Sequence, residues 1–202
     1  FHLGWDTYWS GKSMQKAAVL APIAEQAGDT AARDAFLSYA KSQLEDWFDA
    51  DTGSRYFAYD PNWRTLLGTP GSFNLAQEMN DHHFHYGYHV FTAAMIAMHD
   101  PAWADDYAEI VELLIRDVAN WDRADTRYPF LRNFDPYAAH GWASGHSAFD
   151  TGNNQESSSE SMNFATALIL WGSVMGREDI RDLGVYLHAT EAVAIEQYWF
   201  DA

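Results

Sequence analysis

The amino-acid sequence predicts an all-α fold, built from helical hairpins arranged as in an αα-toroid. Six segments repeat apolar residues at the period of a helix. Three of them are apolar on most faces, which is typical of buried helices, and three are apolar on one face, which is typical of half-exposed helices. The two kinds alternate along the chain. We therefore expect three hairpins, each made of an inner and an outer helix.

The helices follow one another in a regular order. The inner helices are expected at residues 13–27, 82–98 and 160–175. The outer helices are expected at residues 30–48, 101–119 and 179–198. Short joints connect each inner helix to its outer partner, namely Gly28-Asp29, His99-Asp100 and Gly176-Arg177. The start at 101 is the clearest, with Asp100 as cap and Pro101 in the first turn.

Long irregular stretches precede the second and third inner helices, at residues 49–80 and 121–155. The first contains a candidate β-hairpin, because Arg55–Tyr59 and Trp63–Leu67 are β-prone and flank the turn signal Asp60-Pro61-Asn62. In this order, the N-termini of all inner helices and the long loops lie at one end of the array. Since functional residues favour loops on a rigid scaffold, we expect the chemistry at that end.

Length and composition indicate a single helical domain, residues 1–202, with a well-filled core. Hydrophobic residues make up 48% of the 202 residues. Three hairpins are too few for a closed ring, so we expect a half or incomplete toroid. No apolar run reaches the length of a membrane helix, and Phe1–Lys12 lacks the pattern of a signal peptide.

Charge and cysteine content exclude several classes of function. The net charge of -17 argues against nucleic acid and against an anionic membrane surface as partners, because both require a basic footprint. The chain has no Cys, so thiolate metal sites and Cys nucleophiles are excluded. A neutral or cationic partner remains open.

The first candidate cluster opens the second inner helix and reads Asn80-Asp81-His82-His83-Phe84-His85-Tyr86-Gly87-Tyr88. Asp81 has two interpretations, as a helix N-cap or as a catalytic carboxylate with His85 one turn deeper on the same face. A metal site made of His82, His83 and His85 is a third alternative. Its geometry is poor, because neighbouring residues do not share a helix face.

The second cluster, residues 153–163, carries Glu156 and Glu160 at the start of the third inner helix. Four residues apart, the two carboxylates share a helix face. Carboxylates suit a helix N-terminus, where the backbone dipole favours negative charge. Because the helix that they open is apolar on most faces, we expect at least one of them to face inward.

Two further clusters combine aromatic and hydrogen-bonding side chains, a combination that suits a sugar. One lies at residues 5–12, before the first inner helix, and the other at residues 135–145, in a long loop. The candidate contacts to a sugar are Asp6, Tyr8, Lys12, Tyr137 and Trp142. For residues 135–145, an ordered loop without a catalytic part is the alternative.

Paired carboxylates in an aromatic cleft are the groups that glycoside hydrolysis requires. One acid protonates the leaving oxygen, and one carboxylate activates water or attacks the sugar, without metal or cofactor. A non-catalytic glucan-binding module and an αα-toroid protein-interaction scaffold are the alternatives. The binding module has no use for converging carboxylates, and the scaffold requires an exposed apolar groove.

Several of these motifs resemble the signatures of glycoside hydrolase family 81. They are residues 80–88, Asn154–Glu160, Asp6-x-Tyr8-x-x-Gly11-Lys12 and Asp135-Pro136-Tyr137 with Trp142–Gly145. The resemblance implies an (α/α)6-type catalytic core of an endo-β-1,3-glucanase that acts on laminarin- and callose-type glucans. It implies no metal or cofactor. It also implies a larger enzyme with an N-terminal β-sandwich, located outside the cell or at the cell wall.

The resemblance further assigns roles to individual residues. It implies an inverting mechanism in which Asp81 is the general acid, Glu156 the general base and Glu160 a third essential carboxylate. His85, Tyr8 and Lys12 would contact the sugar. A general acid needs a raised pKa, whereas a helix N-terminus lowers the pKa of a carboxyl. We therefore expect burial or a nearby carboxylate, such as Glu160, to outweigh the helix at Asp81.

Overall fold

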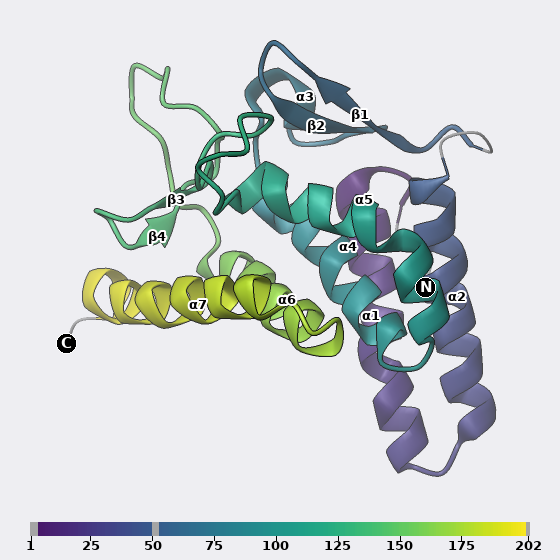
Figure 1. Cartoon of the computed structure of the whole chain (residues 1–202). Helices are drawn as coiled ribbons and strands as arrows, with labels where there is room; N and C mark the ends of the chain where they lie inside the picture. Colours follow the sequence, from purple (N-terminus) through teal and green to yellow (C-terminus); the bar gives the residue numbers. More distant parts are fainter. Residues whose placement is uncertain (1–3, 50–52, 201–202) are drawn as a thin grey trace.

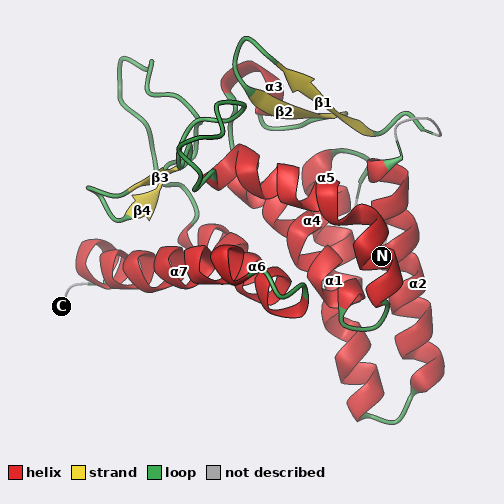
Figure 2. Ribbon diagram, viewed as in Figure 1, coloured by secondary structure: helices red, strands yellow, loops and turns green. Residues whose placement is uncertain are grey.

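The computed structural model describes residues 4–49 and 53–200 and consists mainly of three helical hairpins (Figure 1). The first hairpin pairs α1 (Thr7–Gln26) with α2 (Thr30–Phe48). The second pairs α4 (His82–Ala97) with α5 (Pro101–Ala119), and the third pairs α6 (Ser158–Val174) with α7 (Glu178–Trp199). Figure 2 shows how little of the described chain is strand. The predicted all-α fold is confirmed.

The inner helices pack against one another in the order α1, α4, α6. Within α4, Phe91 and Met95 are the residues that are not buried. The outer helix α2, by contrast, buries Ala40, Leu44 and Trp47. This difference confirms the predicted alternation of inner and outer helices. Each hairpin thus contributes one inner and one outer helix, as expected for part of a ring of hairpins.

Two glycines allow the inner helices to approach closely. A Cβ on Gly11 of α1 would lie 3.0 Å from the Cβ of Tyr88 on α4. A Cβ on Gly87 of α4 would lie 3.2 Å from the Cβ of Phe164 on α6. Both distances are shorter than ordinary van der Waals contact, so larger residues at these positions would push the helices apart.

Helix α1 begins at Thr7 and not at residue 13, which corrects the predicted boundary. The reason is the side chain of Asp6, whose Oδ1 accepts hydrogen bonds of 2.9 and 3.0 Å from the backbone N–H groups of Tyr8 and Trp9. Such a cap satisfies N–H groups that have no partner inside the helix. Tyr8 and Lys12 therefore lie one turn apart on a helix, and not in a preceding loop.

The long stretches contain small ordered elements. Strands β1 (Tyr56–Asp60) and β2 (Thr65–Thr69) form an antiparallel pair, which confirms the predicted hairpin, although β2 begins two residues later than expected because the turn is longer. The short helix α3 (Leu75–Glu78) and the pair β3 (Phe134–Asp135) and β4 (His140–Gly141) are too short for sequence periodicity to reveal.

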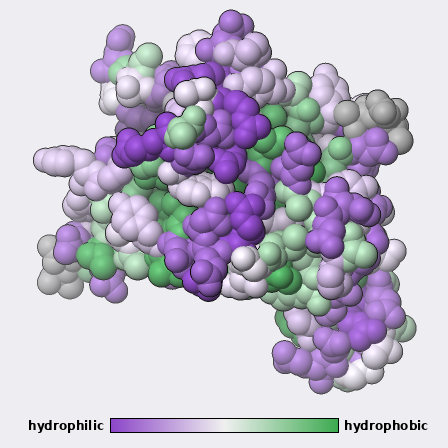
Figure 3. All heavy atoms as spheres, in the orientation of Figure 1, coloured by the Kyte–Doolittle hydropathy of each residue, from purple (hydrophilic) through white to green (hydrophobic). Residues whose placement is uncertain are grey.

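The surface agrees with the acidic composition. Hydrophilic residues cover most of the face in Figure 3, and apolar atoms show between them in separate areas. None of the described helices combines the length and the apolarity needed to cross a bilayer.

A buried carboxylate, Asp117 on α5, joins the β-hairpin to the helices. Its Oδ1 accepts hydrogen bonds from the Thr65 hydroxyl at 2.7 Å and from the backbone N–H of Leu66 at 2.8 Å. Its Oδ2 lies 2.6 Å from Nδ1 of His82, the first residue of α4. Burial alone would raise the pKa of Asp117, but His82, Arg132 and the Leu66 N–H outweigh burial and lower it.

We predict that Asp117→Ala lowers the free energy of unfolding by about 3–5 kcal/mol at neutral pH, because several buried donors lose their acceptor. Since the folded pKa lies below the unfolded value of about 3.9, this stability is present above about pH 4 and is lost as the pH falls through the folded pKa. Thermal unfolding between acidic and neutral pH checks this. Asp105→Ala, at an exposed position of the same helix, is the control and should change little. Equal effects of the two changes would contradict the prediction.

Candidate active site

The N-terminal ends of the three inner helices meet around the carboxylate of Glu160, in the first turn of α6. Its Oε1 accepts a hydrogen bond of 2.9 Å from the hydroxyl of Tyr8 on α1 and another from the hydroxyl of Tyr88 on α4. The Nζ of Lys12 lies 3.7 Å from the same oxygen. These contacts confirm that the inner helices open at the same end of the array.

Asp81 occupies the N-cap position of α4 without capping it. Its φ of 58° is left-handed, whereas cap residues are normally extended, and its side chain makes no hydrogen bond to the first turn. Oδ2 accepts a hydrogen bond of 2.8 Å from Nδ2 of Asn80. Oδ1 is buried and has no hydrogen-bond partner among the described residues. The carboxyl group is therefore not used by the helix, and the interpretation of Asp81 as a simple cap is wrong.

The surroundings of Asp81 favour its protonated form. Burial, followed by the charges of Glu156 and then Glu160, raises its pKa to about 7. Each of these effects disfavours the carboxylate, and together they outweigh the helix N-terminus. The pKa therefore has the direction that the sequence predicts for a general acid. Asn80, the residue before Asp81, also lines one cavity together with Glu156.

Glu160 has the opposite electrostatic balance. Its partial burial would raise its pKa, but hydrogen bonds from Tyr88, Ser157 and Tyr8, together with the charge of Lys12, lower the pKa instead. Four groups that donate to or attract the carboxylate thus keep it ionised. Glu160 is a fixed negative charge beside Asp81.

The side chain of Glu156 is exposed and lines a cavity. Its Oε2 lies 3.4 Å from Nδ2 of Asn154, the one hydrogen bond that its carboxylate makes to the described residues. The cavity has a volume of about 400 Å³ and is lined largely by polar residues, among them Asn74, Glu78, Asn80, Ser144, Asn153, Asn154 and Glu156. Glu156 is therefore the carboxylate that water reaches most easily.

Glu156 also has a left-handed backbone, with a φ of 63°. This conformation is uncommon for a residue with a long side chain, and it costs on the order of 1–3 kcal/mol. The left-handed backbone of Asp81 costs less, because short polar side chains tolerate this conformation better. Strained backbone that the fold maintains is frequent at functional sites.

The backbone of Ala143 connects the two strained residues. Its carbonyl accepts a hydrogen bond of 2.8 Å from the N–H of Asp81, and its own N–H donates one of 2.7 Å to the carbonyl of Asn154. Ala143 is fully buried. The loop at 135–145 therefore holds Asp81 and the segment before Glu156 in register. This role is structural, so the alternative of an ordered loop without a catalytic part stays open.

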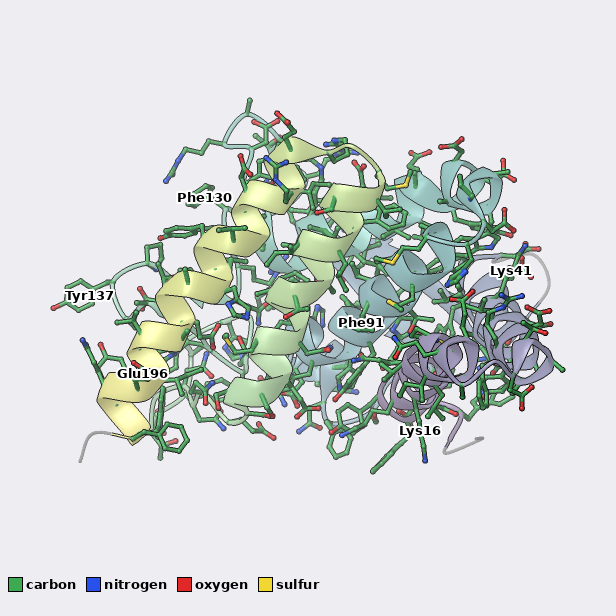
Figure 4. The ribbon with its side chains drawn as sticks, turned by 90° about the horizontal axis from the view of Figure 1, so that it is seen from below. Lys16, Lys41, Phe91, Phe130, Tyr137 and Glu196 are labelled. Atoms are coloured by element: carbon green, nitrogen blue, oxygen red, sulfur yellow. The ribbon has the colours of Figure 1, made fainter. Side chains whose placement is uncertain are left out.

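The predicted aromatic contacts are unequally placed. Trp142 borders a second cavity of about 400 Å³, which shares Ser144 and Asn153 with the cavity at Glu156. Tyr137 is 98% exposed, and Figure 4 shows it pointing away from the helices. Both remain predicted sugar contacts. Phe91, which sequence analysis did not select, lies between α6 and α1 in the same view.

Two other predicted contacts have structural partners. Oδ1 of Asp6 caps α1 and also accepts a hydrogen bond of 2.8 Å from the hydroxyl of Ser72. The ring of His85 is completely buried, with Nδ1 2.7 Å from the hydroxyl of Thr7 and with Tyr8 packed against it. In this structure His85 supports Tyr8 from behind and has no exposed surface. Direct sugar contact by Asp6 or His85 stays a prediction.

The three histidines proposed as an alternative metal site point into different surroundings. His82 contacts Asp117 and the carbonyl of Leu75, whereas His85 contacts Thr7. His83 lines a separate small cavity. Among residues 4–49 and 53–200, no three His, Asp or Glu side chains converge as a metal-binding group.

Sequence analysis placed Tyr88 in a candidate cluster without assigning it a role, and it did not select the pair of Glu78 and His146. Tyr88 follows Asp81 by seven residues and lies on the same helix face, so helical spacing was a usable signal. Nε2 of His146 lies 2.6 Å from Oε2 of Glu78, at the edge of the two cavities. No spacing rule relates these two residues, which are 68 positions apart.

Comparisons with known proteins show the family to which the chain belongs. A glucan endo-1,3-beta-D-glucosidase of Acetivibrio thermocellus is 58% identical over 97% of this chain, and one of Thermobifida fusca is 51% identical over 98%. The chain spans about a quarter of the length of these relatives, 26% in both cases. A solved structure of a glycoside hydrolase family 81 protein from Clostridium thermocellum, 55% identical, superposes with a TM-score of 0.95 and covers 99% of this chain and 28% of that one.

The family model described as "Glycosyl hydrolase family 81 C-terminal domain" matches residues 5–201, which is nearly the whole chain. The resemblance in the sequence motifs, the helical hairpins and the family model agree. This chain belongs to glycoside hydrolase family 81.

Proposed function

We propose that this chain forms the acid–base centre of an endo-β-1,3-glucanase that inverts the anomeric carbon. The observation that carries the proposal is the pair formed by Asp81, buried with a pKa raised to about 7, and Glu156, an exposed carboxylate beside it. The names of the relatives, all glucan endo-1,3-beta-D-glucosidases, support the substrate class. One of them is named for the glucan of the primary septum, which supports an enzyme that acts at or outside the cell wall.

In the proposed reaction, the protonated carboxyl of Asp81 gives its proton to the glycosidic oxygen as the bond from that oxygen to the anomeric carbon breaks. Glu156 takes a proton from a water molecule, whose oxygen bonds to the anomeric carbon from the opposite side. Each cleavage consumes one water molecule and yields two shorter glucan chains. No metal or cofactor takes part.

Different surroundings assign the two roles. A general acid must hold its proton near neutral pH, which suits Asp81. A general base must be ionised and reachable by water, which suits the exposed Glu156 better than Glu160 with its two tyrosine donors. In this proposal Glu160 keeps the pKa of Asp81 high and orients Tyr8 and Tyr88. Tyr8, Lys12 and Trp142 are the proposed sugar contacts.

The first prediction concerns the acid. Asp81→Asn should lower the hydrolysis of laminarin by about 10²–10⁴-fold, because the leaving oxygen no longer receives a proton. An aryl β-glycoside of a β-1,3-linked glucose oligomer, whose phenolate leaves without a proton, should be cleaved nearly as fast as by the wild type. Reducing ends and released phenolate measure the two rates. Asp105→Asn, at an exposed position, should retain both activities. Undiminished laminarin hydrolysis by the Asp81 variant would reject the assignment.

The second prediction concerns the base. Glu156→Gln should remove activity on both substrates, since water is no longer activated, and added azide should restore cleavage of the aryl substrate with an α-glycosyl azide as product. NMR of the product identifies the anomer. The working carboxyl groups of Asp81 and Glu156 should be separated by about 6.5–9.5 Å, the range for inversion. If Glu160→Gln lost activity while Glu156→Gln kept it, Glu160 would be the base. A β-anomeric product of laminarin would overturn inversion.

The third prediction concerns stability. The pKa of Asp81 is about 7 in the folded chain and about 3.9 in an unfolded one. Because folding favours the protonated carboxyl, Asp81 contributes stability below about pH 4. This contribution is lost as the pH rises through 7. Above pH 7, Asp81→Asn should therefore have a higher melting temperature than the wild type. Its free energy of unfolding should be higher by up to about 4 kcal/mol. The difference should vanish below about pH 4, and a constant difference would contradict the raised pKa.

A further inference from the structure

A further carboxyl, which is buried, lies behind the site on the outer helix α7. Glu191 is 1% exposed and faces the inner helix α6 instead of solvent. The reaction described above does not use it. A buried carboxyl is unfavourable unless donors satisfy its oxygens, so the identity of those donors indicates what it does.

Two residues that face Glu191 flank the two carboxylates of the site. The hydroxyl of Ser161, the residue after Glu160, donates a hydrogen bond of 2.7 Å to Oε2. The side chain of Gln155, the residue before Glu156, faces the same carboxyl, and its buried nitrogen has no well-formed hydrogen bond within the described chain. One carboxyl on α7 thus contacts both ends of the segment 155–161.

A second hydrogen-bond donor lies in the loop that aligns Asp81 with this segment. The backbone N–H of Gly141 points to Oε1 of Glu191 at 3.5 Å. Gly141 also packs directly on the segment, because a Cβ there would lie 3.0 Å from the Ser161 hydroxyl oxygen. Two residues further, Ala143 makes the backbone hydrogen bonds to Asp81 and Asn154. Glu191 therefore contacts both the segment that carries Glu156 and Glu160 and the loop that binds the backbone of Asp81.

The charged and titratable neighbours of Glu191 are few. Burial raises its pKa, while the donors named above and the charge of His140 act in the opposite direction. His83 lines the same small cavity, but its burial lowers its pKa to about 3, so it is neutral near pH 7. The interactions that remain for Glu191 are hydrogen bonds to the segment 155–161 and to Gly141.

We propose that Glu191 is a positioning residue, which fixes Glu156 and Glu160 relative to Asp81 by holding Ser161, Gln155 and Gly141 on one carboxyl group. The inference rests on the proposed function for its catalytic consequence. Without this anchor, the segment 155–161 would relax from the left-handed conformation at Glu156. Both carboxylates would then move away from Asp81.

The test uses the full-length protein with Glu191→Ala, Glu191→Gln and the control Leu183→Ala. Leu183 is a buried apolar residue two turns earlier on α7, so its truncation destabilises the helix without removing a hydrogen bond to the segment. Glu191→Ala should lower kcat on laminarin by about 10- to 100-fold, with KM changed less than about threefold, because misplaced groups slow chemistry more than binding. Glu191→Gln, which keeps an acceptor for Ser161, should recover most of the loss.

The pH profile separates positioning from mere stability. The charges of Glu156 and Glu160 help to raise the pKa of Asp81. If Glu191→Ala lets these two carboxylates move away from Asp81, the basic limb of the kcat/KM profile should shift to lower pH. Leu183→Ala should lower the melting temperature and leave the basic limb in place. Ser161→Ala should shift the limb in the same direction, and the double variant should be no worse than Glu191→Ala alone.

Hydrogen exchange of the amides in 155–161 gives a readout that does not depend on activity. It should be faster in Glu191→Ala than in Leu183→Ala. If the two variants match in kcat, pH profile and exchange, positioning by Glu191 is rejected. If Glu191→Ala does not fold, Glu191→Gln and Ser161→Ala decide by the same criteria. If the wild type does not cleave laminarin, the proposed function fails, and faster exchange in the segment would still support the anchor.

Discussion

The burial of α4 between α1, α5 and α6 is the constraint on which the rest of the structure depends. A helix enclosed in this way needs small residues where its neighbours cross, which explains the contacts at Gly11 and Gly87. It also needs partners for its polar groups. His82 finds Asp117 and His85 finds Thr7, so the histidines that resemble metal ligands in the sequence belong to separate hydrogen-bond networks. Enclosure of α4 thus rigidifies the end of the molecule at which Asp81 lies.

Function at that end conflicts with stability. A cap residue that bonded to its own helix would stabilise α4, yet Asp81 turns its carboxyl group away and is buried near two other carboxylates. Glu156 adds an unfavourable backbone conformation. Such features persist only where the surrounding structure determines them strongly. Here the surroundings are the backbone of Ala143 and the core beneath α4, both fully buried.

Four carboxyl groups of one end of the molecule differ through their surroundings and not through their chemistry. Asp81 is buried with one oxygen unpartnered and lies near two carboxylates, so its pKa is raised and favours the protonated form. Glu160 receives hydrogen bonds from two tyrosines and stays ionised, while Glu156 reaches solvent. Glu191 faces the backbone that supports the other three. In the proposed mechanism, an acid, a charge, a base and an anchor therefore come from the same functional group.

Residue periodicity alone predicts the six long helices, their alternation and the end at which the loops gather, because a helix records its buried face in every turn. Motif spacing likewise selects Asp81, Glu156 and Glu160.

The helix boundaries and the partners of buried side chains do not follow from periodicity. The start of α1 depends on whether Asp6 turns its carboxyl group toward the helix, and the role of Asp81 depends on its φ angle. The burial of His85, the pairing of Glu78 with His146 and the reach of Glu191 to Ser161 join residues far apart in the chain. Such contacts exist only after the helices pack, since local patterns carry no information about which distant side chain will share a buried space.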